Sequence, residues 1–140
     1  MVDDVVLNKV AVIERCVARV HEEYNLDPTN FASDFTRQDA AILNIQRACQ
    51  AALDLANSVV RDQKIGIPQS ARDVYTLMAD RNIISSSLAA TLRRMVGFRN
   101  VAVHDYQSLQ AEIVQDVITN RLDDLLVFAQ QMLTFSRKRT

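Results

Sequence analysis

One short segment holds most of the residues that could do chemistry in this chain. Residues 99–107 read RNVAVHDYQ. The arginine, Arg99, presents a rigid fork of donors that suits a phosphate. The histidine, His104, carries an imidazole, a side chain that can accept or donate a proton in catalysis. RNA carries its own nucleophile, the 2′-hydroxyl, so its cleavage needs proton transfer and a cation beside the phosphate. These residue types predict metal-independent cleavage of RNA.

The spacing within the segment decides which side chains can meet. Successive residues of a helix turn by about 100°, so Asn100 and His104, four apart, can touch. Arg99 and Tyr106, seven apart, fall within about 20° of one another. Arg99 and His104 lie about 140° apart on an ideal helix, although a long arginine side chain can still reach a shared substrate. A helix end near Asp105 would change these angles.

The elements that position this segment are predicted to be helices. The chain has 140 residues but only 2 Gly and 2 Pro, which disfavours a many-stranded β protein. Apolar residues recur at helical spacing, with Val103 and Ile113 among those expected to face inward. A fourth predicted helix begins near residue 86 and contains Val103; the others cover residues 3–24, 34–63, 70–81 and 109–135. The prediction is an all-α, up-and-down bundle of four to five helices.

Polar residues mark where these helices should begin. Asp34 or Thr36 suits the N-cap of the second helix. Ser70, followed by Asp73, resembles a capping box at the start of the third. One of three consecutive serines at 85–87 should cap the fourth, and Ser108 the last.

The charge distribution excludes a general nucleic-acid-coating protein. The net charge is −1, from 16 basic and 17 acidic residues. Residues 81–107, however, contain four arginines and a single aspartate, a local charge of +3. Such a basic strip suits a short RNA segment.

The remaining features predict an ordinary cytoplasmic protein without a cofactor. Cys16 and Cys49 have no C-x-x-C spacing and are expected to be buried free thiols. No apolar run approaches the roughly 20 residues of a membrane span, and the N-terminus has no targeting signal. The sequence contains no metal-ligand spacing and no glycine-rich phosphate loop. His21 is expected to be a surface histidine.

The string from Arg99 to Tyr106, R-N-x-x-V-H-x-Y, resembles the signature of HEPN domains. The resemblance is closest to the HepT toxins and is strengthened by the preceding residues 95–98, MVGF. It extends over residues 1–140, which we expect to form a single domain. The segment 37–40, RQDA, at the start of the second helix also looks like a feature of the family.

The resemblance implies a small helical bundle that dimerises and acts as an endoribonuclease toxin. Arg99 and His104 would be the catalytic pair, and Asn100 would support them at the substrate. Tyr106 would line the site. The implied partner besides RNA is a minimal nucleotidyltransferase antitoxin of the MntA type, which would block the toxin by attaching AMP groups to Tyr106, a reaction called AMPylation.

The chemistry gives an independent reason for a homodimer. Acid–base cleavage of RNA usually uses two proton-transfer groups, whereas each chain offers one plausible histidine, His104. A twofold axis that joins two copies of the motif would place two histidines and two arginines in one cleft.

Two other interpretations remain open. The chain could be a non-catalytic, nucleotide-binding partner of a nucleotidyltransferase, with Arg99 gripping a phosphate and Tyr106 stacking on a base. The titratable His104 argues against this, because binding alone does not call for it. The chain could also be a purely structural dimer, which the apolar stripes allow but which leaves the motif unexplained.

Overall fold

The computed structural model describes residues 3–138, which are almost entirely helical. The chain forms two short 3₁₀ segments, Pro28–Ser33 and Tyr106–Ser108. Its α-helices are α1 (Asp4–Leu26), α2 (Phe35–Asp62), α3 (Ala71–Asp80), α4 (Ser86–His104), α5 (Ala111–Asn120) and α6 (Asp123–Lys138). No strand occurs within residues 3–138, which confirms the all-α prediction. The single domain expected for residues 1–140 includes two residues at each end that lie outside this range.

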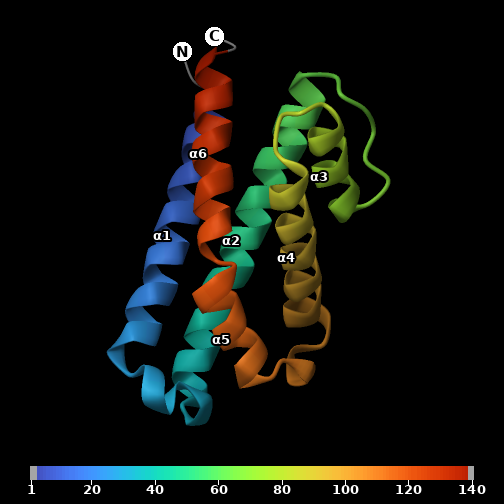
Figure 1. Ribbon diagram of the computed structural model, residues 1–140. Helices are drawn as coiled ribbons and strands as arrows, with labels where there is room; N and C mark the ends of the chain where they lie inside the picture. Colours follow the sequence, from blue (N-terminus) through green and yellow to red (C-terminus); the bar gives the residue numbers. More distant parts are fainter. Residues whose placement is uncertain (1–2, 139–140) are drawn as a thin grey trace.

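The helices form an up-and-down bundle around α2. Helix α2 contacts α1, α3, α4, α5 and α6, and α1 also packs along α6. The start of α1 and the end of α6 lie at one end of the bundle (Figure 1). The opposite end holds the start of α2 and the end of α4, although these segments are far apart in the sequence (Figure 1). This end therefore receives the candidate motif.

Aromatic pairs and small residues pack the core of the bundle. Tyr75 of α3 meets Phe128 of α6 edge to face, with ring centroids 5.6 Å apart. Tyr24 and Phe31 make a similar contact at 5.1 Å, which seats the first 3₁₀ segment against α1. Such pairs contribute about 0.5–1.5 kcal/mol each beyond their burial. Along α2 the buried positions include five alanines, and small side chains there let neighbouring helices approach closely.

Three of the four predicted caps begin helices as expected. Asp34 accepts a hydrogen bond from the Arg37 amide at the start of α2, and Ser85 accepts one from Leu88 at the start of α4. Ser70 accepts a hydrogen bond from the Asp73 amide. The return bond of this capping box goes to the amide of Gln69, one residue earlier than in the standard motif.

The prediction of one continuous helix over residues 109–135 is wrong. The chain breaks at Arg121 and Leu122, where both amides donate to the carbonyl of Val117 and end α5. Leu122 is fully buried at the corner, so the apolar periodicity runs through the break and conceals it. The corner lets α5 pack against α2 and the first 3₁₀ segment while α6 runs back along α1 (Figure 1).

Three further expectations for this region are wrong. The hydroxyl of Ser108 bonds to Asp105 and does not cap α5. Val103 and Ile113, predicted to face inward, are 47% and 46% exposed. Periodicity identifies an apolar face but cannot tell whether the same chain covers it.

The expectation for the two cysteines is confirmed. Cys16 and Cys49 are both buried free thiols. Among the helices of residues 3–138, none has the length and apolar character needed to cross a membrane.

Candidate active site

The motif straddles the end of α4. The amide of Asp105 donates to the carbonyl of Val101 at 2.8 Å, but the backbone of Asp105 is no longer helical. His104 is therefore the last residue of α4, and Tyr106 begins a 3₁₀ turn. Because the helix stops between them, the predicted alignment of Arg99 with Tyr106 on one helical face is wrong.

The guanidinium of Arg99 is directed toward α2 and α3. Burial raises the pKa of the Cys49 thiol to about 12, and the charge of Arg99 opposes that rise. Burial also raises the pKa of Tyr75, again against the charge of Arg99. Nη1 of Arg99 donates a 2.7 Å hydrogen bond to Oδ1 of Asn100. Asn100 therefore orients the fork, while the buried Nε of Arg99 has no hydrogen-bond partner within residues 3–138.

His104 is exposed and available to a ligand. In the described part of the chain no hydrogen bond or ion pair engages its imidazole, and none joins it to Arg99. One chain thus presents an oriented arginine and a free histidine at the same end of α4. It does not bring these two side chains into contact.

Tyr106 is held by a residue from another helix. Its hydroxyl donates a short hydrogen bond to Oδ1 of Asp39 in α2, 67 residues away in the sequence. Partial burial, this hydrogen bond and the negative charge of Asp39 together raise the pKa of Tyr106 to about 12. The hydroxyl is consequently protonated at neutral pH, although the side chain is 43% exposed.

Sequence reasoning singled out segment 37–40 without assigning it a role. The structure shows that the segment anchors the first turn of α2. Nε of Arg37 pairs with Asp34 at 3.1 Å, and Gln38 donates to the carbonyl of Phe31 at 2.8 Å. These contacts fix the backbone from which Asp39 reaches Tyr106.

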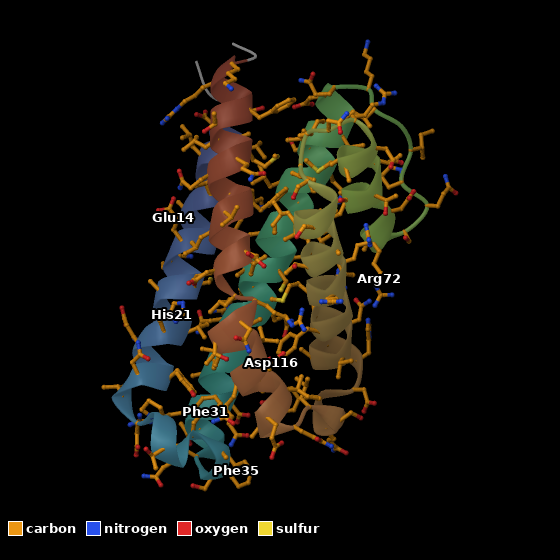
Figure 2. The ribbon with its side chains drawn as sticks, in the orientation of Figure 1. Glu14, His21, Phe31, Phe35, Arg72 and Asp116 are labelled. Carbon is orange, nitrogen blue, oxygen red and sulfur yellow. The ribbon has the colours of Figure 1, made fainter. Side chains whose placement is uncertain are left out.

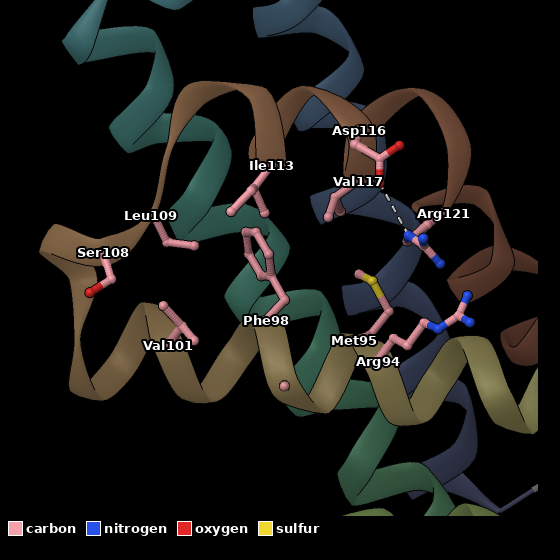
Figure 3. A pocket seen from close by; sticks show the side chains of 11 residues that line it. Arg94, Met95, Phe98, Val101, Ser108, Leu109, Ile113, Asp116, Val117 and Arg121 are labelled. Atoms are coloured by element: carbon pink, nitrogen blue, oxygen red, sulfur yellow. Dashed lines mark hydrogen bonds and ion pairs between the residues drawn. The ribbon is translucent and has the colours of Figure 1, made fainter.

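A pocket of about 410 Å³ opens between α4 and α5, beside the motif. Its floor is apolar, and Arg94 and Arg121 lie together at one end (Figure 3). Arg121 is paired with Asp116 at 3.3 Å. Val101 and Ser108, which flank His104 in the sequence, also line the pocket, so it extends to the end of α4. This pocket was not predicted, because its two walls come from separate helices.

The other histidine has a structural contact. His21 in α1 lies 2.8 Å from Oδ1 of Asp123, the first residue of α6, and its side chain is 35% exposed. It therefore links two helices and is not a free surface residue. Within residues 3–138 no group of three or more His, Cys, Asp or Glu side chains is placed to hold a metal ion.

The sequence matches a known family over most of its length. Residues 13–132 match the family described as ribonuclease HepT-like. The chain is 48% identical over 126 residues to the mRNA nuclease HepT of Shewanella oneidensis. That alignment covers 90% of this chain and 94% of the relative.

Solved structures of toxin–antitoxin complexes share this fold. One is the tri-AMPylated Shewanella oneidensis HEPN toxin in complex with the MNT antitoxin, which is 46% identical with a TM-score of 0.88. It covers 93% of this chain and 97% of that one. Another is a toxin–antitoxin complex with AMP-PNP, 45% identical, also with a TM-score of 0.88, covering 93% and 98% of the two chains.

Proposed function

The chain belongs to the HepT-like ribonuclease family, and from this we propose that it is the toxin of a toxin–antitoxin pair and acts by cleaving RNA. One observation carries the proposal at the level of residues. Arg99 is oriented by Asn100 at the same end of α4 that presents the free imidazole of His104. We further propose that residues 1–140 form one HEPN domain.

The proposed reaction needs no metal. His104 takes the proton of the 2′-hydroxyl, whose oxygen attacks the adjacent phosphorus. The bond from phosphorus to the 5′-oxygen breaks, and a second histidine, the partner's His104, protonates that oxygen. Arg99 and Asn100 lie against the phosphate, where the guanidinium stabilises the extra negative charge of the transition state.

A homodimer supplies the second histidine. Val103, within the motif, and Ile113, which follows it in the sequence, are exposed apolar side chains, and Ile113 also lines the apolar pocket. Exposed apolar side chains beside an apolar pocket are typical of an interaction site. A twofold contact on this surface would cover them and bring two motifs together.

Subunit mixing tests the shared cleft. Wild-type chains are refolded with a roughly ninefold excess of His104→Ala chains, and the activity is compared with that of an equal total amount of wild-type protein. We expect about 1% of that activity, since only pairs of two wild-type chains contain two copies of His104. If each chain worked alone, about 10% would remain. Mixing with His21→Ala chains is the matched control and should leave the activity nearly complete.

Substitution of Arg99 tests whether the motif cleaves or only binds RNA. We expect Arg99→Ala to lower the cleavage rate by about 10²- to 10³-fold in a buffer with EDTA, because a preorganised donor to the phosphate is lost. Arg99→Lys should recover little, since an ammonium lacks the fork. The rate is measured on a labelled RNA. An unchanged rate in Arg99→Ala, or no cleavage by the wild type, would favour a binding module.

The proposed partner is a nucleotidyltransferase antitoxin that AMPylates Tyr106. Support comes from the likeness to a tri-AMPylated toxin in complex with its MNT antitoxin. The Tyr106 hydroxyl belongs to an exposed side chain two residues after His104. A bulky anionic group attached there would obstruct the site and repel RNA phosphates.

We propose that the protein acts in the cytoplasm. Both cysteines are free thiols, and free thiols are typical of a reducing compartment. RNA and ATP, the substrates of the two proposed reactions, are present there.

A further inference from the structure

We propose that Asp39 is the proton acceptor for AMP transfer to Tyr106, so that the toxin supplies the base for its own modification. This inference rests on the proposed function in one respect: it takes Tyr106 as the acceptor of the AMP group. It assigns a role to a carboxylate outside the Arg–His motif.

The contact between the two residues carries the inference. The Tyr106 hydroxyl already donates a hydrogen bond to Oδ1 of Asp39. A general base must lie within hydrogen-bonding reach of the proton that it removes, and Asp39 meets this condition before any partner binds.

Asp39 also differs from the other aspartates around it. Asp34 pairs with Arg37, and Asp105 accepts a hydrogen bond from Ser108. Among the residues that the structure describes, the carboxylate of Asp39 contacts no cation and accepts only the hydrogen bond from Tyr106. Within the described residues, therefore, no cation competes with the Tyr106 hydroxyl for this carboxylate.

The state of the hydroxyl shows why a base is needed. The pKa of Tyr106 is raised to about 12 by partial burial and by Asp39, so almost no tyrosinate is present at neutral pH. The attacking oxygen must therefore lose its proton during the reaction. The bond from Oη of Tyr106 to the α-phosphorus of ATP forms, the bond from that phosphorus to the bridging oxygen breaks, and pyrophosphate leaves. The proton moves from Oη to the Asp39 carboxylate.

The surface around Asp39 and Tyr106 leaves room for the active site of a transferase that carries the nucleotide. Phe35 and Leu43 lie one turn before and one turn after Asp39, on the same face of α2. They are 75% and 43% exposed. Phe35 lies at the outer end of the bundle (Figure 2). The Asp39–Tyr106 pair is thus accessible from the end of the bundle.

The test follows AMP addition to the full-length chain by its cognate nucleotidyltransferase with ATP, measured as intact mass against time. We expect Asp39→Asn to slow the first addition by roughly 10²-fold or more, because the amide cannot accept the proton. Asp39→Glu should recover part of the rate. Asp105→Asn, which removes the same charge next to Tyr106 in the sequence, is the matched control and should react like the wild type. Size-exclusion chromatography checks that each variant still binds the transferase.

The pH dependence separates a base from a residue that only positions Tyr106. Without the hydrogen bond and charge of Asp39, the Tyr106 pKa should fall from about 12 toward its ordinary value. The rate of Asp39→Asn should then rise about tenfold per pH unit below that pKa, while the wild-type rate changes less. A wild-type rate in Asp39→Asn, a parallel pH profile, or loss of transferase binding would each overturn the inference. Undiminished modification of Tyr106→Phe would instead show that the acceptor in the proposed function is wrong, and the role of Asp39 with it.

Discussion

Replacement of His104 by alanine is expected to lower the rate of RNA cleavage by up to about 10⁴-fold, the upper range for loss of a general acid–base group. In the proposed dimer the substitution would remove both proton-transfer groups from the shared cleft. The imidazole is exposed and makes no hydrogen bond within residues 3–138. Its loss should therefore change the free energy of unfolding by less than about 0.5 kcal/mol.

The measurement is the single-turnover cleavage rate of a labelled RNA, with helical circular dichroism and oligomeric state recorded on the same sample. His21→Ala is the matched control, because it removes the other histidine, which contacts Asp123 on a different pair of helices. It should cleave RNA at the wild-type rate. A folded, dimeric His104→Ala protein that cleaves RNA as fast as the wild type would end the proposed mechanism.

Replacement of Tyr106 by phenylalanine is expected to abolish AMP addition by the cognate nucleotidyltransferase. The change removes the hydroxyl that is proposed to attack the α-phosphorus and keeps the aromatic ring. It also removes the hydrogen bond to Asp39, so the experiment tests the loss of the attacking oxygen together with the loss of the contact that positions the ring. The wild-type protein should gain the mass of one or more AMP groups and lose ribonuclease activity in step with that gain.

Tyr24→Phe is the control for this experiment. Tyr24 lies in α1, packed against Phe31, and its ring contact survives loss of the hydroxyl. This variant should be modified like the wild type. An unmodified wild-type protein, or a mass gain in Tyr106→Phe equal to that of the wild type, would remove Tyr106 from the proposed regulation.

Local features of the sequence were sufficient to predict that the chain is helical and to predict most of the residues at which the helices begin. Asp34, Ser70 and Ser85 each cap a helix through the amide three residues later, so the information lies within one turn. The break between α5 and α6 was missed for the opposite reason. Leu122 continues the apolar period while the chain turns, and only its packing against neighbouring helices reveals the corner.

The residue types of segment 99–107 were enough, by themselves, to predict phosphate and proton chemistry, because Arg99 and His104 carry those properties wherever they lie. Only the tertiary structure decided what surrounds them. It ended α4 at His104, left Val103 exposed and placed Asp39 against the Tyr106 hydroxyl. The contact between Asp39 and Tyr106 joins residues 67 positions apart in the sequence, and no local periodicity encodes a contact between residues so far apart. It depends on the packing of α2 beside α4, which brings the start of one helix to the end of the other.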